Sequence, residues 1–208
     1  MKVLMVNGSP HEEGCTYTAL GEVAKALEKA GVETEIMWLG VDAIAGCIGC
    51  GACAKTGKGC FRGDVVNEFI EKAKEADGFI FGTPVHYAAA SGALTSFMDR
   101  AFYAGGKYMT GKPAAGVVSC RRGGAASTFD QINKYFTINC MPIVSSQYWN
   151  QVHGNSAEEV VKDEEGMQIM RMLGRNMAYM IRAFALAREN GLLPPDMEKP
   201  KMRTNFIR

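Results

Sequence analysis

Residues 1–18 read MKVLMVNGSPHEEGCTYT. Residues 2–7 form a short apolar run that predicts a buried strand, and the segment after it is polar. An amphipathic helix is predicted next, because apolar side chains recur there at helical spacing: Leu20, Val23, Ala24 and Leu27. A strand that passes through a glycine-containing loop into a helix is the first half of a parallel β-α-β unit, so this stretch decides the fold.

The same alternation continues along the rest of the chain. Further strands are predicted at residues 34–39, 78–82, 113–119 and 141–146, and further helices at about residues 65–76, 94–101, 126–139 and 164–189. This pattern predicts an α/β fold: a doubly wound, five-stranded parallel sheet in the order 2-1-3-4-5, with helices on both faces. We expect a single domain over residues 1–190 and a C-terminal tail over residues 191–208.

The composition excludes several classes of function. The chain has 208 residues, a net charge of +1 and a pI near 7.6, so its charge does not favour a nucleic acid or an anionic membrane as a partner. No apolar run approaches the ~20 residues of a membrane-spanning helix. The first residues lack the pattern of a signal peptide, and we expect a cytoplasmic protein whose cysteines are thiols or ligands.

Three loops are predicted at the carboxyl edge of the sheet, where ligands bind in such folds. The first loop spans residues 7–18, and Gly8 and Gly14 permit tight turns in it. The N-terminus of the helix that follows favours an anion, and hydroxyl groups lie beside it on Ser9, Thr16 and Thr18. The glycine spacing matches neither a dinucleotide fingerprint nor a Walker loop. The alternative is a polar loop with an ordinary helix cap. This loop therefore predicts a phosphate monoester site.

The second and third loops add a ring platform and cationic or N–H donors. The second follows residues 78–82 and contains Thr83, Pro84, Val85, His86 and Tyr87; the third contains Ser119, Cys120, Arg121, Arg122, Gly123 and Gly124. Glycines let backbone N–H groups approach a ligand. The alternatives are a turn with a packed tyrosine and a solvated pair of arginines. Together the three loops suit a mononucleotide with a tricyclic ring.

Four cysteines crowd into residues 40–63, a long loop rich in glycine. Cys47, Cys50, Cys53 and Cys60 have the spacing C-x2-C-x2-C-x6-C. Soft thiolates this close together select iron–sulfur clusters or zinc, and three tightly spaced ligands suit a [4Fe–4S] cube better than a tetrahedral zinc site. The alternative is a set of reduced thiols that pack in the loop. We expect the isolated cysteines to be packing residues: Cys15, Cys120 and Cys140.

The first two loops resemble those of the NAD(P)H-dependent FMN reductase group of the flavodoxin-like superfamily. Residues 7–10 with Gly14 and Thr16 are similar to its phosphate loop, and residues 76–87, 91–92 and 98–100 are similar to its second flavin loop. The cysteine loop and residues 165–168 resemble the iron–sulfur flavoprotein branch. The sequence departs from the family at His11, often Arg, at Cys15, often Asn or Ser, and at residues 61–64, which replace a more acidic run.

The resemblance implies a flavodoxin-like fold with bound FMN and a homodimer or homotetramer with the flavin near an interface. It places three groups of residues at the flavin. Around the phosphate and ribityl chain lie Ser9, His11, Thr16, Tyr17 and Thr18; along the ring lie Pro84, Val85, His86 and Tyr87; at the pyrimidine side lie Cys120, Arg121, Arg122 and Gly123. With the flavin carrying the chemistry, no catalytic side chain is required.

Three functions are compatible with these features. The favoured one is an FMN-dependent NAD(P)H oxidoreductase that reduces a small-molecule acceptor: a quinone, an azo or nitro compound, or free flavin. The second is an iron–sulfur flavoprotein that exchanges electrons with ferredoxin. The third is a non-enzymatic flavin-binding redox module, whose flavin NAD(P)H does not reduce. The cysteine loop discriminates the first two, because a cluster makes one-electron exchange with a protein natural.

Overall fold

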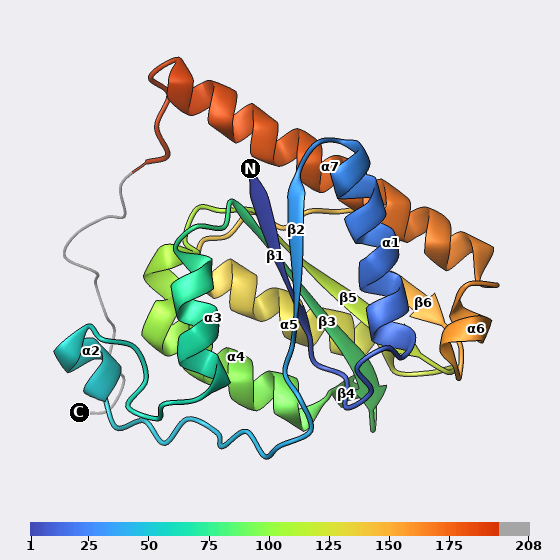
Figure 1. The fold of residues 1–208 in the computed structure, drawn as a ribbon, viewed down its shortest axis with the longest axis horizontal. Helices are drawn as coiled ribbons and strands as arrows, with labels where there is room; N and C mark the ends of the chain where they lie inside the picture. The colour runs from blue at the N-terminus through green and yellow to red at the C-terminus, as the bar shows by residue number, and fades with distance from the viewer. Residues whose placement is uncertain (196–208) are drawn as a thin grey trace, which may run out of the picture.

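The computed structural model describes residues 1–195. Its centre is a sheet of five parallel strands in the order β2-β1-β3-β5-β6 (Figure 1). These strands are β1 (Lys2–Asn7), β2 (Glu33–Trp38), β3 (Gly78–His86), β5 (Ala114–Cys120) and β6 (Gln151–His153). Numbered by their own order, the parallel strands follow 2-1-3-4-5, which confirms the predicted topology. The predicted tail, residues 191–208, lies mostly outside the described residues.

Helices cover both faces of the sheet, as predicted. One face carries α1 (Cys15–Lys29) and α7 (Glu164–Glu189); the other carries α3 (Val65–Ala73), α4 (Gly92–Gly105) and α5 (Ala125–Ile138) (Figure 1). A hydrophobic core lies on each face of the sheet, and successive side chains of β1 point into alternate cores. Val3 and Met5 pack on the α1 side, and Leu4 and Val6 pack on the α3 side. Among residues 1–195, no helix is both long and apolar enough to cross a bilayer.

The predicted fifth strand, residues 141–146, is wrong. Residues 141–144 meet only the start of β5, where Ala114 N donates to Pro142 O and Val144 N donates to Ala114 O. Pro142 has no N–H to continue a ladder. The chain then leaves the sheet and returns as β6, which pairs with the other end of β5. The edge strand is thus split into two short pieces.

Short elements also interrupt regions predicted as loops. β3 continues four residues beyond its predicted end and turns back into β4 (Ala89–Ala90), which pairs with it antiparallel. The cysteine loop contains the short helix α2 (Ala52–Thr56), and α6 (Ala157–Val160) precedes α7. A 3-10 turn follows α4 at Gly106–Tyr108.

Candidate functional site

Three loops meet at the carboxyl edge of the sheet, and we call residues 7–18, 82–92 and 119–124 the first, second and third edge loops. Gly8 N donates to Gly82 O at 2.9 Å, and Ser91 Oγ donates to Gly8 O at 2.7 Å, so the first and second loops are joined. The hydroxyls of Thr16 and Ser119 share a hydrogen bond of 2.9 Å, which joins the first loop to the third. The structure therefore brings together the loops that the sequence predicts as neighbours.

The first edge loop is held by its own polar groups. Ser9 Oγ accepts from His11 N at 3.1 Å, and Ser9 O accepts from Trp38 Nε1 at 2.8 Å. Ser9 and Thr16 are buried, whereas His11 and Tyr17 are exposed. Gly14 precedes α1 without a side-chain cap, so the N–H groups of the first helical turn keep their capacity for an anion. The loop has the donors that a phosphate requires.

The second edge loop is a tight hairpin. Thr83 is buried and its Oγ1 accepts from Ser91 N at 3.0 Å, while Pro84 and Val85 are half-buried. The two residues at the tip, Tyr87 and Ala88, both have left-handed backbones, with φ of 50° and 60°. Such a turn favours Asn-Gly, so this tip is strained. His86 and Tyr87 project from the edge as exposed side chains.

The third edge loop exposes positively charged side chains and backbone N–H groups at the edge of the sheet. Arg121, Arg122 and Gly123 are exposed, and Gly124 begins α5 at a φ of 92° without a side-chain cap. Burial raises the pKa of the Cys120 thiol, and burial also raises the pKa of the Cys15 thiol in the first loop. Both thiols are therefore protonated at neutral pH. The edge loops offer donors and cations to a ligand and no thiolate nucleophile at Cys15 or Cys120.

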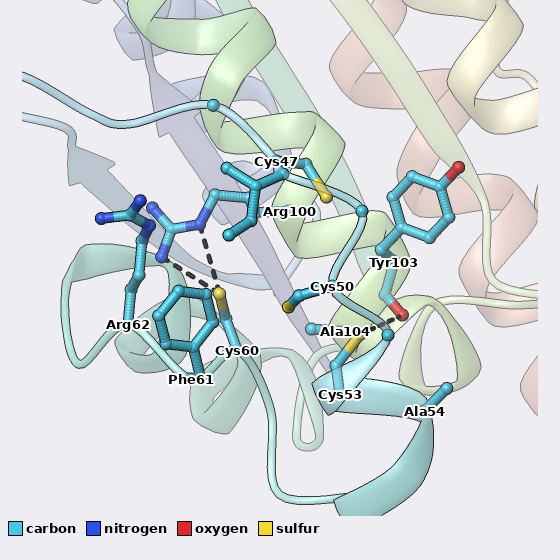
Figure 2. Close-up of a pocket in the computed structure, with 14 residues that line it drawn as sticks. Cys47, Cys50, Cys53, Ala54, Cys60, Phe61, Arg62, Arg100, Tyr103 and Ala104 are labelled. Carbon is cyan, nitrogen blue, oxygen red and sulfur yellow. Dashed lines mark hydrogen bonds between the residues drawn. The ribbon is translucent and has the colours of Figure 1, made fainter.

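The four cysteines of the long loop line one cavity of about 280 Å³, which we call the cysteine cavity (Figure 2). Cys47 and Cys50 are exposed, and Cys53 and Cys60 are half-buried. Arg100, Tyr103 and Ala104 close the cavity from α4. Figure 2 shows hydrogen bonds from Arg100 to Cys60 and from Cys53 to Tyr103. The Cys53 thiol donates to Tyr103 O at 3.7 Å.

The donor set of this cavity is compatible with an iron–sulfur cluster. Within residues 1–195, no three His, Cys, Asp or Glu side chains converge closely enough to hold one metal ion. A [4Fe–4S] cube makes no such demand, because each of its four cysteine ligands binds a different iron. All four thiols border the same space and none is in a disulfide. The chemistry and arrangement of the sulfurs are compatible with a cluster.

Comparison with known proteins places these features in a family. The family model for NADPH-dependent FMN reductase matches residues 1–155, which contain all three edge loops and the cysteine cavity. The chain belongs to the NADPH-dependent FMN reductase family. Membership in this family identifies the protein as a flavin-dependent oxidoreductase that binds FMN.

Individual relatives agree with this assignment. An iron–sulfur flavoprotein of Methanocaldococcus jannaschii is 33% identical over 190 residues, which cover 88% of this chain and 98% of the relative. Two solved structures share the fold. RosB with a bound 8-demethyl-8-formylriboflavin-5'-phosphate intermediate has a TM-score of 0.66 at 15% identity, over 100% of this chain and 96% of RosB. An archaeal flavodoxin has a TM-score of 0.60 at 15% identity, over 88% of this chain and 99% of the flavodoxin. The fold of this FMN reductase family member is therefore flavodoxin-like.

The sequence prediction gave no supporting role to several residues of this FMN reductase family member. Asn7 and Ser91 belong to the predicted loops and Trp38 to a predicted strand. In the structure Asn7 and Trp38 brace the first edge loop, and Ser91 joins it to the second. Arg100 was noted only as part of the family resemblance, yet it contacts a cavity cysteine. Its signal was its position on the apolar face of α4, since a buried arginine needs an acidic or polar partner.

Proposed function

We propose that the protein is an electron-transfer flavoprotein that holds FMN in the edge loops and a [4Fe–4S] cluster on Cys47, Cys50, Cys53 and Cys60. The observation that carries the proposal is that these four thiols line one cavity beside the helix that leads to the edge loops. Ferredoxin or a similar one-electron carrier is the proposed protein partner. The sequence alone favours an NAD(P)H-dependent reductase. The relative at 33% identity, which is named an iron–sulfur flavoprotein, supports the electron-transfer function instead.

Helix α4 provides the proposed link between the two cofactors. Its cap Ser91 lies in the second edge loop and is bonded to Gly8 of the first, while Arg100 and Tyr103 line the cysteine cavity. At about 1.5 Å per residue, the helix carries the chain ~13 Å from Ser91 to Arg100. Bound FMN exchanges one or two electrons and a cluster exchanges one. The chain would thus hold a two-electron group beside the N-terminus of α4 and a one-electron group beside its C-terminal half.

The proposed role of the edge loops is to bind and orient the flavin. The first-turn N–H groups of α1 and the hydroxyl of Ser9 would hold the phosphate. Pro84, Val85, His86 and Tyr87 would lie along the ring. The amides of residues 121–124 and an arginine would stabilise negative charge that develops on the pyrimidine side. The assignments that rest on side chains are tested by FMN affinity in the corresponding alanine variants.

The second candidate is an NAD(P)H-dependent reductase of a quinone, azo or nitro compound, or free flavin. The observation that favours it is the exposure of His86, Tyr87, Arg121 and Arg122 beside the proposed flavin site, which leaves room for a nicotinamide and a small acceptor. We also propose that the chain forms a homodimer or homotetramer, with these exposed side chains near an interface.

The deciding experiment is anaerobic purification followed by a visible spectrum, an iron and sulfide assay, and a mass measurement in solution. The electron-transfer proposal expects flavin bands with a shoulder near ~400 nm and roughly four irons per chain. The same sample is then mixed with reduced ferredoxin, NADH or NADPH, and flavin bleaching is followed. Flavin without iron, bleached by NADPH, would replace the proposal with the reductase. Flavin that none of these donors bleaches would leave a flavin-binding module.

A further inference from the structure

Arg100 is a buried cation whose donors are all used. Its side chain is 1% exposed, although it lies next to the cysteine cavity. Nη1 donates to Asp64 Oδ2 at 2.7 Å and to Ala45 O at 3.3 Å, and Nη2 donates to Asp64 Oδ1 at 2.8 Å. The remaining two donors, Nε and Nη2, reach Cys60 Sγ at 3.3 Å each. The five N–H groups of the guanidinium are thus divided between a carboxylate, a carbonyl and one sulfur.

Both side-chain partners of Arg100, Asp64 and Cys60, are held by further hydrogen bonds. Asp64 caps α3 by accepting from Val66 N at 3.2 Å. Burial by itself would raise the pKa of Asp64, but the hydrogen bonds from Arg100 and Val66 outweigh it and lower that pKa below its usual range, so Asp64 is charged. The Cys60 backbone is clamped by Asn67, which accepts from Cys60 N and donates to Cys60 O, both at 2.8 Å. The position of Cys60 is therefore fixed by contacts of both its backbone and its sulfur.

This arrangement acts on a sulfur that would carry negative charge in a cluster. A thiolate bound to iron is still an acceptor, and N–H groups directed at it favour the more negative state of the cluster. Adding one electron makes the cluster one unit more negative without adding a proton. A guanidinium stays charged throughout, because arginine does not lose its proton in proteins.

We propose that Arg100 is a positioning residue that holds Cys60 Sγ in place and raises the reduction potential of the cluster through its two N–H···S bonds. The inference rests on the proposed function, since it requires the cluster. Asp64 has the opposite effect on the potential, because its negative charge offsets that of Arg100. Substitution of Arg100 alone and substitution of Asp64 alone should therefore shift the reduction potential in opposite directions.

The test is an anaerobic redox titration of the cluster in the purified holoprotein, followed by electron paramagnetic resonance. In Arg100→Lys the charge remains but the forked donor is lost, and we expect the equilibrium constant for one-electron reduction to fall about tenfold, which corresponds to about 59 mV. In Asp64→Asn, which keeps a good helix cap, we expect the constant to rise. The reference variant is Arg62→Gln, whose arginine lines the same cavity but packs over the Phe61 ring at 5.2 Å.

The possible outcomes separate this inference from the proposed function. Opposite shifts in Arg100→Lys and Asp64→Asn, both larger than that of Arg62→Gln, support it. Loss of iron from Arg100→Lys with FMN retained supports the positioning role, and Asp64→Asn then tests the effect on potential. A full iron content with an unchanged potential in both variants, or shifts in the same direction, overturns this inference alone. Wild-type protein without iron overturns the proposed function, and the inference falls with it.

Discussion

Gly124 of the third edge loop packs against the tip of the second. Its φ of 92° lies in the left-handed region, and a Cβ built on it would lie 2.7 Å from Ala88 Cα. That contact is with backbone, which moves only if the strained tip of the hairpin moves with it. Gly123 next to it has open space around its Cβ position. The two glycines therefore form a matched pair at the site.

We expect Gly124→Ala to weaken FMN binding and to lower the free energy of unfolding by ~1–3 kcal/mol, since it adds both a backbone conflict and an unfavourable φ. Gly123→Ala should leave both quantities within ~0.5 kcal/mol of wild type. Fluorescence titration with FMN and urea denaturation measure the two effects. Equal affinities in the two variants would show that the junction of these loops does not shape the flavin site.

Residue-level prediction works where a single residue type carries the chemistry. Glycines, hydroxyls and clustered cysteines are visible in the sequence because their types are special, and the structure places them in the edge loops and the cysteine cavity. The partners that hold them, such as Ser91 and Asn67, have no special type and act through contacts that only the fold creates. This is why the sequence names candidate residues but does not show which partners brace them.

At the scale of elements, helices were easier to predict than the edge of the sheet. The 3.6-residue pattern of α7 reproduces its bounds at Glu164–Glu189, because a long amphipathic helix repeats its signal many times. β6 has three residues, with Val152 buried between Gln151 and an exposed His153, which is too short a pattern to recognise. The apolar run at residues 141–144 was the stronger signal, but Pro142 and the departure of the chain limit its pairing to the start of β5.

The packing of α1 against α7 depends on Gly174. A Cβ at Gly174 would lie 2.7 Å from both Val23 O and Ala26 Cβ, so the helices approach at this point as closely as their backbones permit. Gly174→Ala should destabilise the protein by ~1–3 kcal/mol through overpacking. Gly21 lies in α1 and has nothing within 4 Å of its Cβ position. Gly21→Ala should therefore stabilise the protein by ~0.5–1 kcal/mol through helix propensity.

Thermal and urea unfolding of the two variants check this prediction. The opposite signs are what matter, because both substitutions add the same methyl group to a helix interior. If Gly174→Ala raised the free energy of unfolding, α1 and α7 would be able to move apart without losing packing energy, and the contact at Gly174 would not limit their approach.

At the scale of the whole molecule, the edge loops adjoin the N-terminus of α4 through Ser91, and the cysteine cavity adjoins its C-terminal half through Arg100, Tyr103 and Ala104. No residue of the edge loops lines the cavity. We expect Cys53→Ser to reduce iron from roughly four per chain to well below that, while FMN absorbance per chain stays at the wild-type level. Cys140→Ser, which changes an exposed cysteine outside both sites, should alter neither.

Iron assay and visible absorbance on anaerobically purified protein measure both quantities. Loss of FMN from Cys53→Ser would mean that the two sites depend on each other and are not independent binding units. Full iron in Cys53→Ser would exclude this cysteine as a ligand.

The split edge strand also affects how copies of the chain can associate. A long uninterrupted edge strand is a template for another chain, and natural sheets avoid it with short or charged edge strands. Within residues 1–195, β6 has only three residues, and β2 at the other edge carries Glu33 and Glu35, with Glu35 paired to Lys2 at 2.6 Å and Lys72 at 2.7 Å. Both edges therefore resist continuation of the sheet into a neighbour. These two edges therefore favour association through side-chain surfaces, which allows closed oligomers, over sheet continuation, which would give fibrils.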